Sequence, residues 1–255
     1  MHELRKVGTR ETPMSLLFET TPDGTGRYID WILNGLCWTL SLAFGAWAIA
    51  LVVGTLVGVA RTLPRGIWPR LGRVYVETFR NIPLLVQMFF WYFVLPELLP
   101  QRLGLAIKQM DPPWGSFVPA LICLGLFTAA RIAEQVRAGV QALPVGQTAA
   151  ASALGFGRGG MYRLILLPQA FRIILPTLTN EFMTIFKNTS VALTIGLVEL
   201  TATAREINEN TFRTFEAFGV VTIVYLVIAL LAWQLMHRIE RAVQLPSFVS
   251  GSGRK

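Results

Sequence analysis

Ionisable side chains lie inside a stretch that is otherwise apolar enough to cross a membrane. Residues 173–198 form this stretch and contain Glu181, Lys187 and Asn188. Charged groups at membrane depth are costly, so they usually face a cavity or a partner charge. Glu181 and Lys187 are six residues apart and point to different faces of a straight helix, so we do not expect them to pair. Lys187 and Asn188 are candidates for contacting an anionic substrate. Alternatively, Lys187 extends to the outer interface or pairs with a neighbouring subunit.

A second charged group lies at the end of another apolar stretch, residues 114–134. Here Arg131, Glu134 and Arg137 lie on a helix that leaves the membrane, with Arg131 the deepest of the three. Glu134 and Arg137 are three residues apart and are neighbours on one helical face. We expect this group to neutralise charge near the cytoplasmic interface. The alternative role for Arg131 and Glu134, as for Glu181, is to line a gate or a translocation path.

No pattern in the sequence is typical of catalysis or of cofactor binding. The G-x-x-x-x-G-K-[S/T] phosphate loop is absent, so we do not expect the chain to hydrolyse ATP. No Ser/His/Asp, Cys/His or metal-ligand spacing occurs, and there are only 2 histidines. Cys37 and Cys123 both lie in apolar runs, and we expect them to be small buried side chains. The sequence therefore predicts no catalytic residues, no cofactor and no metal site.

The elements that must position the charged residues are membrane spans. Of the 255 residues, 53% are hydrophobic and 15% are charged, whereas a soluble domain carries about 25% charged residues. Five stretches have the length and composition to cross a ~30 Å hydrocarbon core, at about 36–59, 82–99, 114–134, 173–198 and 217–236. They fall in a membrane domain at 27–245, between an N-terminal extension (1–26) and a tail (246–255). We expect a basic loop at 60–80 and a short polar turn at 101–115.

The loops alternate between richer and poorer in basic residues. Fourteen of the 23 Lys and Arg lie at 60–80, 131–172 and 237–255. Eight lie at 1–34, 101–115 and 197–216. The positive-inside rule places the first group in the cytoplasm, so the N-terminus lies outside and the C-terminus inside. This orientation, with attraction to anionic membrane lipid, explains the net charge of +8 without a nucleic-acid partner.

The same orientation places a glycine-rich, non-spanning segment, residues 141–168, in the cytoplasm. Pro144 and Gly146 break the helix that leaves the third span. Four glycines between 155 and 160 make a bend, and residues 161–167 are expected to restart a helix that Pro168 interrupts. The segment is either a connecting loop that packs on its own bundle or a surface that contacts a partner in water.

Several motifs resemble those of ATP-binding-cassette (ABC) importer permeases. Ala150-Ala151, Gly155 and Ile165-Leu166-Leu167-Pro168 have the spacing of the "EAA" loop of these proteins. Residues 80–87, 133–140 and 187–190 resemble motifs of the polar amino acid uptake branch, and 126–131 is similar to glutamate/aspartate importer permeases. The resemblance extends over about residues 31–245.

The resemblance implies an all-helical type-1 permease of the cytoplasmic (inner) membrane, with segment 141–168 docked on a cytoplasmic ATPase dimer. The docking residues would be Gly146, Ala149, Ala150, Ala151, Gly155, Ile165, Leu167 and Pro168. Ala149 stands where the family usually has glutamate, so this contact would depend on packing instead of a salt bridge. Further implied partners are a second, related permease that forms a heterodimer with this chain, and an extracytoplasmic amino-acid-binding protein.

The implied function is ATP-driven import of a polar amino acid, with glutamate or aspartate favoured. Two alternatives remain at this point. One is an importer of glutamine or of a basic amino acid, because the binding protein sets much of the specificity. The other is a stand-alone secondary transporter, against which the absence of two related halves argues.

Overall fold

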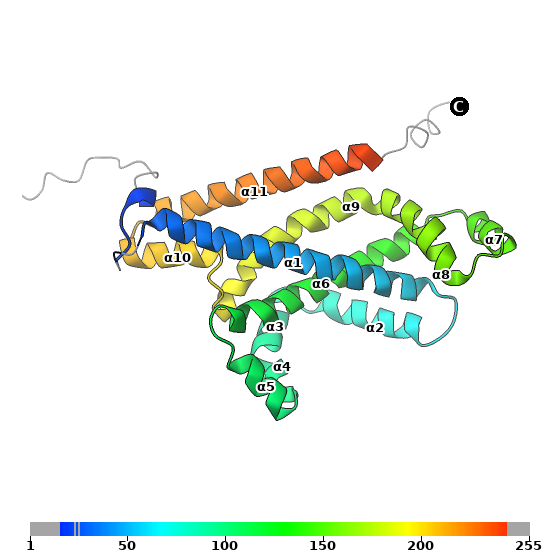
Figure 1. Ribbon diagram of the computed structural model, residues 1–255, viewed down its shortest axis with the longest axis horizontal. Coiled ribbons are helices and arrows are strands. Elements are labelled where there is room, and N and C mark those ends of the chain that lie inside the picture. The colour runs from blue at the N-terminus through cyan, green and yellow to red at the C-terminus, as the bar shows by residue number, and fades with distance from the viewer. Residues whose placement is uncertain (1–15, 23, 25, 244–255) are drawn as a thin grey trace, which may run out of the picture.

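A computed structural model describes residues 16–22, 24 and 26–243, and these residues are helical apart from turns and one isolated bridge between Thr20 and Arg27 (Figure 1). Three described helices are long and apolar enough to cross a membrane: α1 (Tyr28–Thr62), α6 (Trp114–Gln141) and α11 (Thr214–Val243). They contain the first, third and fifth expected spans. Residues 1–15 of the expected N-terminal extension and the whole tail 246–255 fall outside the described residues.

The second expected span is the second part of a bent helix pair. α2 (Trp68–Asn81) is followed by α3 (Leu84–Phe89), the π-helical segment η2 (Phe90–Val94) and α4 (Leu95–Leu98), with a bend of 107° between the two parts. The bend falls at Ile82, which is extended because a residue before proline avoids the helical region. If the pair is one span, the number of candidates rises to four. The expected loop at 60–80 is therefore wrong over the length of α2.

A helix also occupies part of the expected polar turn at 101–115. α5 (Gln101–Lys108) begins after Pro100, whose carbonyl accepts a 2.8 Å hydrogen bond from the Leu103 N–H. Proline at this position lacks an N–H that the helix start would leave unpaired anyway. The expectation of a turn without a helix was therefore wrong.

The fourth expected span begins earlier than its apolar stretch. α8 (Arg158–Met161) and the π-helical segment η3 (Tyr162–Leu166) run into α9 (Leu167–Asn188), and a 3₁₀ segment, η4 (Thr189–Ile195), follows. The expected interruption at Pro168 is wrong. Instead, the helix widens just before this proline, so that the Leu167 N–H bonds the Tyr162 carbonyl five residues back. A π turn of this kind relieves the clash between a proline ring and the preceding turn.

The packing of α1 on α6 depends on glycines. A Cβ at Gly54 would lie 2.8 Å from Ile132 Cβ, and one at Gly58 would lie 2.7 Å from Val136 Cβ and 2.9 Å from the Ala133 carbonyl oxygen. The Gly-x-x-x-Gly pair at 54 and 58 therefore lets the two helices approach closely, as in membrane helix pairs generally. This contact fixes the depth at which the charged part of α6 lies.

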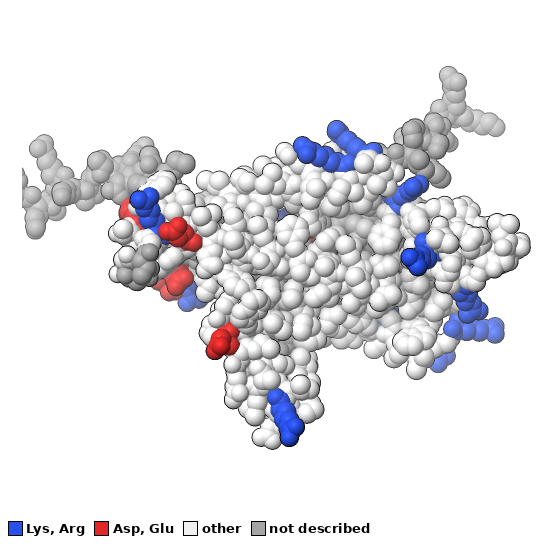
Figure 2. All heavy atoms as spheres, in the orientation of Figure 1, with Lys and Arg blue, Asp and Glu red and all other residues white. Residues whose placement is uncertain are grey.

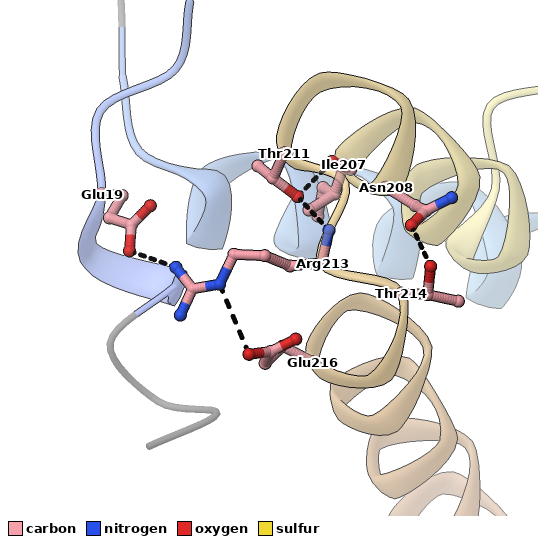
Figure 3. A network of polar contacts seen from close by, with 7 residues as sticks. All are labelled: Glu19, Ile207, Asn208, Thr211, Arg213, Thr214 and Glu216. Atoms are coloured by element: carbon pink, nitrogen blue, oxygen red, sulfur yellow. Dashed lines mark hydrogen bonds and ion pairs between the residues drawn. The ribbon is translucent and has the colours of Figure 1, made fainter. Parts of the chain in front are cut away.

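A polar network ties down the end of the molecule where α10 (Leu200–Thr211) turns into α11 (Figure 3). Arg213 Nη1 lies 2.6 Å from Glu19 Oε1, and its Nε lies 3.4 Å from Glu216 Oε1. The Thr214 hydroxyl donates a 2.7 Å hydrogen bond to Asn208 Oδ1. The network joins the segment that precedes α1 to the last helix of the bundle.

The two cysteines differ from expectation in one respect. Cys123 is buried, but Cys37 is exposed, and both are free thiols. α1 buries one stripe that includes Gly35, Thr39 and Leu42. Cys37 lies two residues from both Gly35 and Thr39 and therefore points away from that stripe.

Candidate functional site

The segment after α6 projects from one end of the bundle as α7 (Val145–Ala153) and α8, at the right of Figure 1. α7 ends in a Schellman motif, a helix C-cap closed by two backbone hydrogen bonds. The Phe156 N–H bonds the Ala151 carbonyl at 3.1 Å, and the Gly155 N–H bonds the Ser152 carbonyl at 3.1 Å. This geometry requires a left-handed residue, and Gly155 has φ +79°. A glycine is thus needed where the chain reverses between the two short helices.

The residues expected to dock on a partner divide into an exposed set and an inward set. Ala151 is only 2% exposed and packs with Met161 and Leu166 in a small core inside the segment. Ile165 and Leu167 are half-buried, whereas Gly146, Ala149, Ala150, Gly155 and Pro168 are exposed. Part of the small-residue pattern therefore holds the segment together, and the rest faces solvent.

Exposed apolar side chains at the projecting end were missed by sequence reasoning. Val145 is 86% exposed, Leu154 76% and Leu164 63%. Isolated apolar side chains in a loop give no sequence signal, because only the fold shows which of them stay uncovered. Together with Ala149 and Ala150 they give the projection an exposed apolar surface of the kind that marks contact sites, although the projection also exposes Arg158 and Arg163.

Two polar contacts fix the projection to the membrane helices. Gln147 Nε2 donates a 2.8 Å hydrogen bond to Gln169 Oε1, which joins α7 to the first turn of α9. The hydroxyls of Thr62 and Tyr162 are 2.8 Å apart, which joins the end of α1 to η3. A displacement of α7 and α8 would therefore act on α1 and α9 directly.

The second part of the site is a group of charges inside the bundle. Arg131 Nη1 lies 3.4 Å from Glu181 Oε2, and Gln135 Nε2 lies 3.3 Å from Glu181 Oε1. The guanidinium of Arg131 also lies 5.4 Å from the centre of the Phe127 ring, within range of a cation–π contact. The sequence singled out Arg131 and Glu181 separately, but their contact spans 50 residues and has no local signal.

Glu134 binds two guanidiniums. Arg137 Nη1 lies 2.7 Å from Glu134 Oε1, as the three-residue spacing predicted. Arg61, from the end of α1, contacts the other carboxylate oxygen, and its side chain is 9% exposed. This second contact was not predicted, because Arg61 appeared to belong to a basic loop.

A cavity of about 380 Å³ lies beside this group and is lined by Arg61, Val76, Glu77, Arg80, Asn81 and Glu134. Four of these residues come from α2. Arg73, Glu77 and Arg80 recur at helical spacing and are exposed, so one face of α2 is a charged stripe that ends at the bend before Pro83. This stripe was not predicted, because residues 60–80 were expected to form a loop.

Lys187 and Asn188 lie apart from this group, in the last turn of α9. Lys187 is exposed and Asn188 is half-buried. Among the described residues, the Lys187 ammonium has no ion pair, in agreement with the expectation that it does not bind Glu181. Thr177 and Asn180 are exposed on the same helix. With Lys187 they form a polar stripe on the face of α9 that points away from the other helices of this chain.

The helical fold, in which three described helices are long and apolar enough to cross a membrane, is that of a membrane transport permease. Residues 50–245 match the family described as binding-protein-dependent transport system inner membrane component, and the chain belongs to this family. It is 43% identical over 237 residues to the glutamate/aspartate import permease protein GltJ of Escherichia coli (strain K12), covering 92% of this chain and 96% of the relative. It is 33% identical over 217 residues to the glutamine transport system permease protein GlnP of the same strain, covering 85% and 94%.

Solved structures agree with this assignment. A crystal structure of an amino acid ABC transporter with histidines matches with a TM-score of 0.69 and 31% identity, covering 84% of this chain and 95% of the other. The MetNI methionine ABC transporter also matches with a TM-score of 0.69, but at 21% identity it shows the fold alone. The chain is a permease subunit of an amino acid ABC importer and a multi-pass protein of the cytoplasmic membrane.

Proposed function

We propose that this chain is the permease through which an ATP-driven importer moves glutamate or aspartate into the cytoplasm. The observation that carries the substrate class is the 43% identity with a glutamate/aspartate import permease along almost the whole chain. The excess of guanidiniums around Glu134 and Glu181 supports an anionic substrate. Glutamine or a basic amino acid is the alternative, because a glutamine permease is also related to the chain.

The chain spans the membrane five times in this proposal, with its N-terminus outside. α1, α6 and α11 are three of the spans, α2 to α4 form a bent one, and α9 with η4 forms the fifth despite its charges. The charge distribution supports the orientation. Figure 2 shows carboxylates gathered near α10 and the start of α1, whereas Lys and Arg dominate the opposite end, near α2 and α7.

The topology can be tested with single cysteines in a variant that lacks Cys37 and Cys123. Ser152 on α7 and Asn210 on α10 are both exposed and lie at opposite ends of the bundle. A membrane-impermeant maleimide added to intact cells is expected to label Asn210→Cys, and to label Ser152→Cys only after the cells are opened. Labelling of Ser152→Cys in intact cells would invert the orientation.

The projection of α7 and α8 is the contact with a separate ATPase dimer that hydrolyses the ATP. Its exposed Ala149, Ala150 and Val145 would fill an apolar groove. Movement of the ATPase would pass through the Gln147–Gln169 contact to α9 as rigid-body motion.

The remaining partners are a second permease and an extracytoplasmic binding protein. Two relatives named glutamate/aspartate import permease, GltJ and GltK, resemble the chain at 43% and 32% identity, which supports pairing with a related but different permease. The polar exposed stripe of α9 is a suitable surface for that pairing, because lipid would leave it unsatisfied.

Transport assays in proteoliposomes test the function. The chain, its partner permease and the ATPase are reconstituted with ATP inside, and the binding protein with labelled L-glutamate is added outside. We expect uptake that depends on ATP and on the binding protein, and less uptake of L-glutamine. Uptake by this chain alone, without ATPase, would favour a secondary transporter instead.

A further inference from the structure

The last turns of α11 extend beyond the hydrocarbon core of a bilayer. α11 has 30 residues and is therefore about 45 Å long, whereas the core is about 30 Å thick. The apolar span within it ends at Met236. At 1.5 Å per residue, the backbones of Arg238 and Arg241 lie about 3 Å and about 7.5 Å beyond that point. Because the headgroup layer is about 5–8 Å thick on each side, both guanidiniums reach lipid headgroups.

Two stripes of side chains run along α11 on its outer side, and each ends in one of these arginines. The stripes are Leu231, Leu235 and Arg238, and Trp233, His237 and Arg241, at spacings of three or four residues. Leu231 is 59% exposed and Trp233 is 47% exposed. Figure 1 shows α11 along the edge of the bundle, and Figure 2 shows basic side chains gathered over its end. An apolar surface that leads to arginines, with a tryptophan beside it, is typical of a membrane interface.

No carboxylate of the described chain neutralises these arginines, since neither guanidinium forms an ion pair with a described residue. Glu240 is next to them in sequence but is engaged elsewhere. Its Oε1 accepts a 2.5 Å hydrogen bond from the Thr179 hydroxyl on α9, and its Oε2 lies 3.3 Å from His237 Nδ1. Residues one or two positions apart on a helix do not face each other. The outer side of the last turns therefore keeps two positive charges.

We propose that Arg238 and Arg241 bind the phosphate of an anionic phospholipid whose acyl chains lie along Leu231 and Leu235. A guanidinium can bind a phosphate through two parallel N–H donors. The alternative occupant of this face is the second permease, but a protein contact would bury two like charges, which is costly without carboxylates opposite them. The inference goes beyond the proposed function and uses its orientation only to assign the lipid to the cytoplasmic leaflet.

Lipid bound here stabilises the packing of α11 on α9. The hydrogen bond between Thr179 and Glu240 joins these helices at the same turns, on the inward side of α11. A headgroup held on the outward side keeps the end of α11 at the depth where that bond forms. The importer should therefore be more stable with an anionic phospholipid than with a zwitterionic one.

The test measures the melting temperature of the importer, purified with its partner permease and ATPase in a non-ionic detergent and freed of lipid. Dioleoyl phosphatidylglycerol is the anionic probe and dioleoyl phosphatidylcholine the zwitterionic one. Glycerol 3-phosphate supplies a phosphate without acyl chains. We expect phosphatidylglycerol to raise the melting temperature by about 2–4 °C more than phosphatidylcholine does. Glycerol 3-phosphate should have no effect. In Arg238→Gln/Arg241→Gln the difference between the two lipids should fall below about 1 °C.

A matched control separates this site from the general attraction of a basic surface to lipid. Arg70 and Arg73 on α2 have the same three-residue spacing, are exposed, and have no ion pair with a described residue. Arg70→Gln/Arg73→Gln removes the same charge from a different helix and should keep the full lipid effect. Arg238→Lys/Arg241→Lys keeps both charges and should keep most of it. All variants are first checked for elution as the intact complex in size-exclusion chromatography.

Four results would overturn the proposal. Both lipids could stabilise the wild type equally, or glycerol 3-phosphate could reproduce the effect of phosphatidylglycerol. Arg70→Gln/Arg73→Gln could lose as much of the lipid effect as Arg238→Gln/Arg241→Gln, which would leave only diffuse attraction. Finally, Arg238→Gln/Arg241→Gln could release the second permease, which would assign this face to a protein contact. The proposed function fails separately, if the wild-type importer shows no ATP-dependent uptake of acidic amino acids in proteoliposomes.

Discussion

The Tyr225 hydroxyl donates a 2.7 Å hydrogen bond to Glu199 Oε2 and so joins the start of α10 to the middle of α11. Glu199 is 0% exposed, and its other oxygen accepts a 2.9 Å hydrogen bond from the Ala202 N–H, which caps α10. Burial raises the pKa of this carboxyl above its ordinary value, while the hydrogen bonds from Tyr225 and the backbone oppose the rise. The carboxyl is thus both a helix cap and a link between two helices.

Two substitutions of Glu199 should distinguish the effect of its hydrogen bonds on stability from the effect of its charge. Glu199→Ala removes the cap and leaves the Tyr225 hydroxyl with only its 3.2 Å contact to the Thr201 hydroxyl, so we expect a loss of about 1–3 kcal/mol in stability. Glu199→Gln keeps an oxygen to accept from Ala202 and should lose much less. Thermal unfolding in detergent, followed by size-exclusion chromatography, measures both. Equal losses in the two variants would contradict the role of the hydrogen bonds.

The raised pKa of Glu199 also predicts a dependence on pH. An acid whose pKa is higher in the folded protein stabilises the fold fully below its unfolded pKa, about 4.3. That contribution is lost as the pH rises through the folded pKa. The melting temperature of Glu199→Gln relative to the wild type should therefore increase from about pH 4 to neutral pH. A difference that stays constant or falls over this range would show that the carboxyl is not destabilised by burial.

Gly58 should tolerate no side chain, because α1 and α6 meet there. A Cβ would lie 2.7 Å from Val136 Cβ and 2.9 Å from a backbone oxygen that cannot move aside. We expect Gly58→Ala to destabilise the protein by about 1–3 kcal/mol. Gly219→Ala on α11 is the control, because no atom lies within 4 Å of its Cβ position. Similar melting temperatures for both variants would refute the close approach.

Much of the fold could be predicted, because apolar length and helical period are local properties. The spans in α1, α6 and α11 were found from runs without charge. The bent pair was not, because the charged residues of α2 resembled a loop and the position of the bend depends on Ile82 and Pro83. The prediction at Pro168 was wrong for a related reason. A proline inside a helix predicts a break, but here a π-helical turn just before Pro168 accommodates its ring and the helix continues.

For the candidate site, the sequence predicted individual residues but not most of the contacts between them. Charge inside an apolar stretch picked out Arg131, Glu134 and Glu181, but it did not show that Arg131 contacts Glu181 or that Arg61 contacts Glu134. Arg61 contacts Glu134 across 73 positions of the chain, and no spacing rule reaches that far. The Glu134–Arg137 contact was predicted because it lies within one helical turn. In the projecting segment, the sequence could not show that Ala151 packs inward while Ala150 is exposed.

Gly155 should be essential for the link to the ATPase. A residue other than glycine at φ +79° costs about 1–2 kcal/mol, and an aspartate would also add a negative charge at the exposed bend between α7 and α8. We expect Gly155→Asp to abolish uptake and ATPase stimulation while the protein still inserts in the membrane. Gly159→Asp adds the same charge in equally open space without a positive φ, and it should retain more activity. Normal uptake by Gly155→Asp would refute the docking role.

Lys187 tests whether the exposed stripe of α9 faces the transported anion. Its ammonium is exposed in the last turn of the helix and has no ion pair with a described residue. If it contacts the substrate, Lys187→Met should lower the initial rate of L-glutamate uptake about tenfold, since a charged hydrogen bond contributes about 1.5–3 kcal/mol, with assembly intact. Lys108→Met is the matched control, because Lys108 pairs with Glu97 on a short helix away from α9. If Lys187→Met transports both L-glutamate and L-aspartate at the wild-type rate, Lys187 lies outside the path, and it extends to the membrane interface or pairs with a neighbouring subunit instead.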